Sequence, residues 1–225
     1  MSNVPQQISP PRIESAGLLK EVMTGYYAAA KLSECSSTKV AWVTSGAPVE
    51  ILYAADVLPV YPENHAALCG AQRMAVDLCE AAEEQGFSRD LCSYARTDLG
   101  AIFSGRSPVG GLPKPDFLVC CNNICGTVTK WYQELQRRFD VPLLFIDAPF
   151  QHGTDGNGDH AKQASLRARR GCSHFPGKGV APNFLDPAAI DYVYHQLADM
   201  RGTVGEFVGR PISDIRLSET LDLSR

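Results

Sequence analysis

Two apolar runs joined by an amphipathic segment constrain the fold of this chain more than any other feature of its sequence. Phe117–Cys121 (FLVCC) and Val141–Ile146 (VPLLFI) are short and apolar, as buried strands are. Between them, one predicted helical face carries four apolar residues: Val128, Trp131, Leu135 and Phe139. A strand, a helix and a second strand form a βαβ unit whose strands are parallel. The sequence therefore predicts an α/β fold.

Similar patterns in the rest of the chain indicate a larger parallel-sheet domain with flanking helices. Strands are expected at residues 40–43 and 57–60, and helices at residues 16–33, 49–55, 71–85, 88–103, 186–207 and from Ser213 onward. Ser88 is the expected N-cap of the helix at 88–103, and Gly105 its expected terminator. We predict the following divisions: a disordered leader (1–15), a Rossmann- or flavodoxin-like domain (16–150), an irregular glycine-rich insertion (151–182) and a helical extension (183–225).

Composition and charge exclude several classes of protein. With 21 Lys and Arg against 25 Asp and Glu, the net charge is −4, which argues against nucleic acid as a partner. No apolar run approaches the roughly 20 residues of a membrane span. The N-terminus has neither a basic start nor an apolar core, so a secretory signal is not expected. We therefore expect a cytoplasmic protein whose eight cysteines are free thiols.

Two cysteines stand at predicted helix starts, where a thiol can serve as a ligand or a nucleophile. Cys125 directly follows the strand Phe117–Cys121 and opens the next helix, and Cys92 lies near the start of another helix 33 residues upstream. They could share a metal or cluster only if the fold brings both helix starts to one crevice; otherwise both are small, partly buried apolar residues. Cys120 and Cys121 are expected in the core, and the same reading applies to three others: Cys35, Cys69 and Cys79.

The predicted insertion contains polar residues of several kinds. Its histidines and Cys172 match no standard zinc spacing, and Asp155–Asp159 lacks the Gly and Glu of a calcium loop. Five basic residues between Lys162 and Lys178 could attract a phosphorylated ligand or an acidic partner, or could simply be solvated.

Three motifs in order give the chain a specific family resemblance. The segments 44–60 (TSGAPVEILYAADVLPV), 91–96 (LCSYAR) and 122–131 (NNICGTVTKW) together resemble the benzoyl-CoA reductase and 2-hydroxyacyl-CoA dehydratase family, which includes the 2-hydroxyglutaryl-CoA dehydratase D-component. The resemblance covers residues 41–150, continues more weakly through the predicted helices after Asp186, and corresponds to the N-terminal half of a family subunit. Tyr61–Asn64, the Lys-Trp-Tyr run and Gly126, where dehydratases more often have Asp, are closer to the ring-reducing subunits.

The resemblance implies two similar α/β domains that hold a four-iron, four-sulfur (4Fe-4S) cluster through three cysteines. Cys92 and Cys125 match the two ligands of the first domain, and the third belongs to a second domain, which this chain would lack. Cys172 lies in an unmatched segment and is a poor substitute. The chain contains no Gly-x-x-x-x-Gly-Lys-Ser/Thr loop, so ATP would be hydrolysed by a separate activator protein.

By resemblance, the expected function is that of the iron-sulfur subunit of an ATP-driven benzoyl-CoA reductase, an oxidoreductase that passes electrons to an aromatic acyl-CoA. The implied partners are a paralogous α/β subunit, the activator and a ferredoxin. One alternative is a 2-hydroxyacyl-CoA dehydratase subunit, which recycles its electron. Another is a truncated, non-catalytic structural subunit.

Two polar residues beside the strand at 40–43 are the candidate catalytic residues. Ligands of parallel sheets bind outside the carboxyl ends of the strands, where Ser45 and Glu50 follow this strand. We expect them to contact the thioester or supply a proton. The alternative for Glu50 is a carboxylate that only complements the dipole of its helix.

Overall fold

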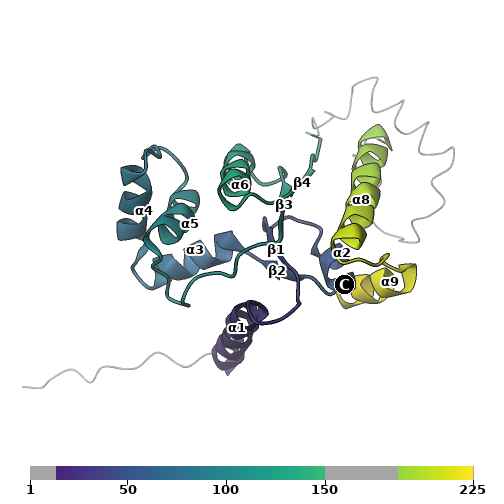
Figure 1. Ribbon diagram of the computed structural model, residues 1–225, viewed down its shortest axis with the longest axis horizontal. Helices are drawn as coiled ribbons and strands as arrows, with labels where there is room; N and C mark the ends of the chain where they lie inside the picture. Colours follow the sequence, from purple (N-terminus) through teal and green to yellow (C-terminus); the bar gives the residue numbers. More distant parts are fainter. Residues whose placement is uncertain (1–13, 150–186, 225) are drawn as a thin grey trace, which may run out of the picture.

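The computed structural model describes residues 14–149 and 187–224 as alternating helices and strands (Figure 1). The predicted insertion and most of the predicted leader lie outside these residues. The elements are α1 (Glu14–Ser33), β1 (Val40–Val43), α2 (Val49–Ala54), β2 (Leu58–Val60), α3 (Pro62–Ala71), α4 (Ala75–Glu84), α5 (Ser93–Ser104), β3 (Phe117–Cys121), α6 (Gly126–Phe139), β4 (Leu143–Ile146), α8 (Pro187–Phe207) and α9 (Asp214–Leu223). The α/β prediction is confirmed.

The four strands form one parallel sheet in the order β2-β1-β3-β4. Ala41 pairs with both Pro59 of β2 and Phe117 of β3, so β1 lies inside the sheet. This is the flavodoxin-like order, in which the chain first adds strands on one side of β1 and then on the other. The carboxyl ends of β1 and β3 therefore flank the point at which ligands of such sheets bind.

Helices cover both faces of the sheet, as Figure 1 shows with α3 to α6 on one side and α2, α8 and α9 on the other. Alternate strand residues point to opposite faces, so Val43 and Val119 pack with α2, α8 and α9, whereas Trp42 and Leu118 pack with α5 and α6. Tyr26 of α1 reaches the β2 edge, where its hydroxyl donates to the Pro59 carbonyl at 3.1 Å.

The segment between β2 and β3 differs from the sequence prediction. The structure has a helix at Pro62–Ala71 that the periodicity did not indicate, and the expected helix at 71–85 begins only at Ala75. Pro62 occupies the first turn of α3, where its missing N–H has no consequence. A turn with Arg73 at φ 58° then separates α3 from α4.

The start of α5 was also predicted wrongly. α5 begins at Ser93, and Ser88 does not cap it, because the Ser88 hydroxyl accepts the backbone N–H of Asp90 at 3.1 Å within a turn. Cys92 is the N-cap residue, so it stands at the boundary between this turn and the helix. The predicted terminator is confirmed, since Gly105 has the left-handed φ of 67°.

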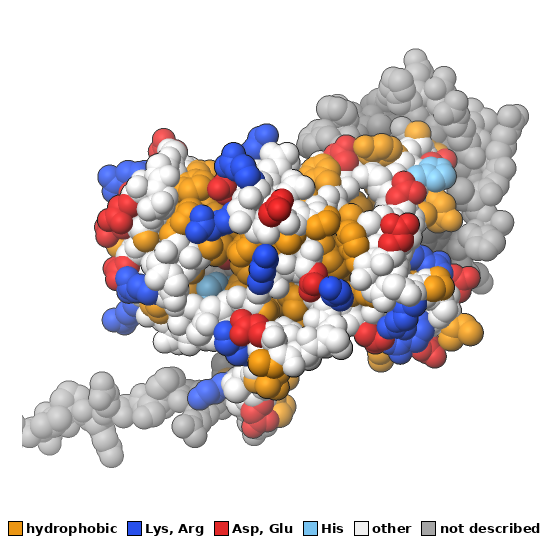
Figure 2. Space-filling model, in the orientation of Figure 1, with side chains coloured by type: hydrophobic (Ala, Val, Ile, Leu, Met, Phe, Trp, Pro, Cys, Tyr) orange, Lys and Arg blue, Asp and Glu red, His pale blue; other side chains and the backbone are white. Residues whose placement is uncertain are grey.

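The two C-terminal helices pack back onto the sheet. Met200, Val204 and Ile212 lie in the core with α2, whereas Ile190, expected on the buried face of α8, is 41% exposed. Asp56, at φ 58°, pairs with Arg210 and with Arg216 and so links this segment to the end of α2. Figure 2 shows positive and negative side chains interleaved at this end of the molecule. Within the described part of the chain, every helix is too short or too polar to cross a membrane.

Candidate functional site

The loops after β1 and β3 meet at the carboxyl edge of the sheet. Thr44, fully buried, donates its backbone N–H to Val119 at 3.1 Å, and its hydroxyl oxygen accepts the N–H of Cys121 at 3.0 Å. A Cβ on Gly46 would lie 2.4 Å from Oδ1 of Asn123, so the two loops approach closely here and a side chain at position 46 would require the Asn123 side chain to move. We call the region between these two loops the strand-end region.

Ser45 lies in this strand-end region and is hydrogen-bonded to a carboxylate from another element. Its backbone N–H donates to Oε1 of Glu63 at 3.2 Å, and its hydroxyl donates to Oε2 at 2.7 Å. Glu63 is in the first turn of α3, directly after β2. Glu63 is not predictable from apolar periodicity, which does not indicate α3; the available signal is a proline followed by an acidic residue, which is typical of a helix start.

Glu50 lies in the first turn of α2, half-buried, and it is not bonded to Ser45. It has no hydrogen-bond or ion-pair partner among the described residues. Burial, with smaller contributions from Tyr53 and Glu50, raises the pKa of Tyr61 to about 12. Glu50 is therefore near Tyr61, which follows β2.

The two candidate ligands occupy equivalent positions on neighbouring helices. Cys125 is the N-cap residue of α6 and Cys92 that of α5, and both thiols are exposed. Four other thiols are buried, as expected: Cys69, Cys79, Cys120 and Cys121. Cys35 was expected in the core but is exposed after the end of α1.

Two contacts show that α5 and α6 run parallel. Nε1 of Trp131 donates to Oδ2 of Asp98 at 2.9 Å, and these residues lie six positions after Cys125 and Cys92, respectively. Nearer the C-terminal ends of both helices, the Arg138 guanidinium lies 4.2 Å from the centre of the Phe103 ring. Contacts in the same order along both helices require the same direction, so both N-cap cysteines lie at one end of the pair. Because α6 follows β3, this is the carboxyl end of the sheet.

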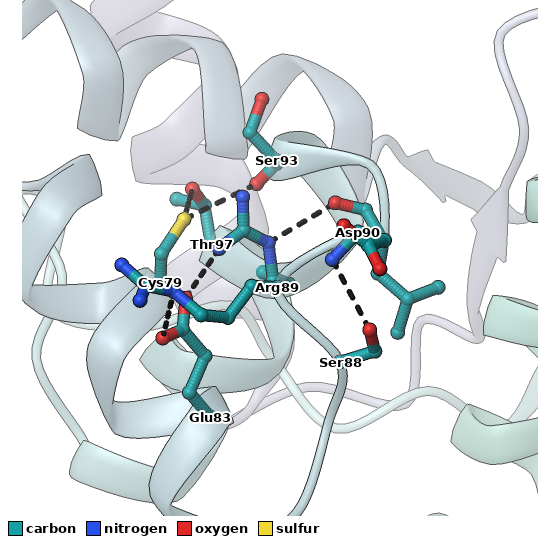
Figure 3. Close-up of polar contacts among 9 residues, drawn as sticks. Cys79, Glu83, Ser88, Arg89, Asp90, Ser93 and Thr97 are labelled. Carbon is teal, nitrogen blue, oxygen red and sulfur yellow. Dashed lines mark hydrogen bonds and ion pairs between the residues drawn. The ribbon is translucent and has the colours of Figure 1, made fainter.

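A polar network fixes the turn that carries Cys92 (Figure 3). Arg96 donates from Nε to the Leu91 carbonyl at 3.1 Å and from Nη1 to Glu83 of α4 at 2.5 Å. Glu83 also pairs with Arg89 at 3.2 Å. The residues on both sides of Cys92 are thereby connected to α4.

The interior between α3, α5 and α6 contains buried polar groups, and some of their atoms have no hydrogen-bond partner among the described residues. Burial raises the pKa of Asp98 to about 7, against the lowering effect of its hydrogen bond from Trp131. Within the described residues, Oδ1 of Asp98 and the Tyr132 hydroxyl have no hydrogen-bond partner. His65 bonds Ser107 through Nε2 at 2.8 Å, and burial lowers its pKa to about 4.

The described residues offer two of the donors that a metal site would need. Two exposed thiols at one end of a helix pair fit the donor chemistry of an iron-sulfur cluster. Their number does not complete a ligand set, since the described ranges contain no group of three or more His, Cys, Asp or Glu able to hold a metal. Cys172 and the basic residues at 162–178 lie outside the described residues.

Comparison with known proteins gives consistent matches. Residues 44–225 match the family model described as 2-hydroxyglutaryl-CoA dehydratase, D-component. The chain is 40% identical over 139 residues to the (R)-2-hydroxyisocaproyl-CoA dehydratase alpha subunit of Clostridioides difficile, covering 62% of this chain and 34% of that protein. It is 42% identical over 124 residues to the (R)-phenyllactyl-CoA dehydratase alpha subunit of Clostridium sporogenes, covering 55% and 30%.

A more distant match is a benzoyl-CoA reductase subunit of Thauera aromatica, 26% identical over 148 residues, which covers 64% of this chain and 34% of that protein. In all three cases the matched region spans only about a third of the relative's length, between 30% and 34%.

Proposed function

Because the chain belongs to the 2-hydroxyglutaryl-CoA dehydratase D-component family, we propose that it is a subunit of an enzyme that removes water from a 2-hydroxyacyl-CoA. Identities of 40% and 42% to two dehydratase alpha subunits, against 26% to the benzoyl-CoA reductase subunit, support this substrate class. The expected benzoyl-CoA reductase, favoured by Gly126, becomes the second candidate function.

The observation that carries the proposal is the position of Cys92 and Cys125 at one end of two parallel helices, on the side of the strand-end region. We assign these two thiolates as ligands of a 4Fe-4S cluster. The remaining protein ligand comes from outside the described residues, in the second α/β domain that the family resemblance implies. Such a cluster would supply single electrons of low potential to an acyl-CoA thioester.

The residues of this chain in the strand-end region can move protons. Loss of water requires one group that takes a proton from carbon and one that delivers a proton to the departing hydroxyl. The Ser45 hydroxyl donates a hydrogen bond to Glu63 at 2.7 Å, and these two residues are our candidates for this exchange. Glu50, with no partner among the described residues, lies beside the same strand ends and is a second candidate for proton transfer or thioester contact.

We propose three protein partners for the complete enzyme. All three matched relatives are themselves named as subunits, which supports a paralogous α/β subunit as the first partner. A separate ATP-hydrolysing activator and a ferredoxin would deliver the electrons.

The iron content of the anaerobically purified complex, co-expressed with the paralogous subunit, tests the cluster assignment. We expect Cys92→Ser and Cys125→Ser to lose most iron and acid-labile sulfide, whereas Cys35→Ser, which changes another exposed thiol, retains both. Equal iron in all variants, or none in the parent, would contradict the assignment. Full activity of both ligand variants would support a structural subunit instead.

Reductant consumption separates the two enzyme candidates. Dehydration needs only a catalytic amount of reductant because the electron is recycled, whereas ring reduction consumes reductant in proportion to product. Glu50→Gln should slow turnover without loss of iron; unchanged turnover would exclude proton transfer by Glu50.

A further inference from the structure

The hydrogen bond between Trp131 and Asp98 is a polar contact inside an otherwise apolar interface. The neighbouring residues from α5 and α6 belong to one apolar cluster: Ala95, Leu99, Val128 and Leu135. Asp98 is completely buried and Trp131 is 4% exposed. The bond, at 2.9 Å, is the one hydrogen bond of the Asp98 side chain among the described residues.

The position of this bond relates it to the two candidate ligands. Both residues lie six positions after an N-cap cysteine, which is about 9 Å along each helix axis. The bond therefore joins α5 and α6 at the same height below both thiols. A rotation or slide of one helix against the other would move its cysteine by a similar amount.

An apolar interface alone specifies register weakly, because aliphatic side chains can repack after a small shift. A single buried polar pair specifies it more strongly, since any shift leaves a donor and an acceptor unpaired in the interior. The indole N–H of Trp131 can donate to one acceptor only. In the described structure that acceptor is Asp98, from the helix that Cys92 begins.

We propose that Asp98 is a positioning residue for the thiol pair: through Trp131 it sets the register of α5 against α6, and thereby the separation of Cys92 and Cys125. The role of this separation in holding a cluster rests on the proposed function. The effect of Asp98 on the separation of the two thiols does not rest on the proposed function, and it can be measured without iron.

The experiment measures cross-linking of the two thiols by a short bis-alkylating reagent. The full-length chain is used before any iron is added, with Cys35→Ser and Cys172→Ser in the background. The other cysteines are buried in the folded protein. The variants are Asp98→Asn, which keeps an acceptor oxygen for Trp131, Asp98→Leu, which removes it, and Trp131→Phe, which removes the donor. Mass spectrometry of peptides identifies the Cys92–Cys125 link.

We expect the parent and Asp98→Asn to form the link with yields within twofold of each other. In Asp98→Leu and Trp131→Phe the yield should fall at least tenfold, while the single-alkylation rate of each thiol stays unchanged. A parent that forms no link, or a folded Asp98→Leu or Trp131→Phe variant that links like the parent, would overturn the inference. If Asp98→Leu does not fold, Trp131→Phe decides.

Iron uptake by the same variants, reconstituted with the paralogous subunit, separates this inference from the proposed function. If linking depends on Asp98 but the parent takes up no iron, the cluster assignment fails and the positioning role stands. If the parent and a folded Asp98→Leu variant take up iron equally, the cluster assignment stands and the thiol separation set by Asp98 has no role in holding the cluster.

Discussion

Glu63 accepts two hydrogen bonds from Ser45, one from the backbone N–H at 3.2 Å and one from the hydroxyl at 2.7 Å. The pair connects the loop after β1 to the first turn of α3, which follows β2. Because the hydroxyl proton is directed to Glu63, the lone pairs of the Ser45 oxygen are available to a bound substrate.

We predict that Glu63→Gln reduces kcat of the assembled enzyme by about 100-fold or more, because proton transfer by a positioned side chain contributes on the order of 10² to 10⁴. The iron content should not change. Glu84→Gln, an exposed position on α4, is the control and should retain full activity. Steady-state kinetics with a 2-hydroxyacyl-CoA check this, and a Glu63→Gln enzyme with normal kcat would exclude the assigned role.

Loss of the ion pair between Glu83 and Arg96 should change the alkylation rate of Cys92 and leave that of Cys125 unchanged. Glu83→Gln weakens the support of the turn at Leu91, so we expect alkylation of Cys92 to accelerate several-fold at constant Cys125 reactivity. The free energy of unfolding should fall by about 1 to 3 kcal/mol, since Arg96 is mostly buried.

Asp77→Asn is the control for this ion pair, because Asp77 and Arg106 form an exposed pair. It should change the free energy of unfolding by less than about 1 kcal/mol. Equal alkylation of Cys92 in the parent and Glu83→Gln would show that the network does not hold the turn.

The stability of the chain should carry a pH dependence from Asp98. Burial raises the pKa of this carboxyl from 3.8 to about 7, so between these values the folded chain binds a proton that the unfolded chain has released. Relative to Asp98→Asn, which stays neutral, the parent should lose about 3 kcal/mol of unfolding free energy as pH rises from 4 to 7.

Denaturant unfolding of the parent and of Asp98→Asn from pH 4 to 7 gives the difference in unfolding free energy at each pH. The contributions of other titrating groups, including His65, are the same in both proteins and cancel in this difference. A difference that does not vary with pH would mean that Asp98 has no raised pKa.

Gly100 should tolerate no side chain. A Cβ there would lie 1.7 Å from the Leu78 carbonyl oxygen, a backbone atom of α4, so Gly100→Ala must separate α4 from α5. We expect a loss of about 3 kcal/mol or more. The control is Gly202→Ala on α8, where nothing lies within 4 Å. It should raise stability by up to about 1 kcal/mol. Thermal unfolding of both variants tests the contrast, and equal melting temperatures would contradict it.

Local sequence patterns were sufficient for much of the fold. The bounds predicted for the strands Val40–Val43 and Phe117–Cys121 are those observed. A short apolar run between polar residues is typical of a buried strand. Ser213 was predicted as a cap and accepts the N–H of Arg216 at 3.2 Å. Such signals act within a few residues and need no knowledge of distant segments.

The errors fall where local signals are weak or compete. The α3 helix lacks a clear apolar periodicity, since its buried residues include His65 as well as apolar side chains. At Ser88, the serine hydroxyl could cap a helix or close a turn, and the position of Arg96 against Leu91 and Glu83 favours the turn.

The sequence by itself determined the α/β class, the parallel βαβ unit and the placement of Cys125 at a helix start, because each depends on residues near one another in the chain. Only the tertiary structure decided that Ser45 pairs with Glu63 and not with Glu50, and that Cys92 lies at the same end as Cys125. These relationships join separate elements, and their geometry depends on strand order and helix packing, which local periodicity does not encode.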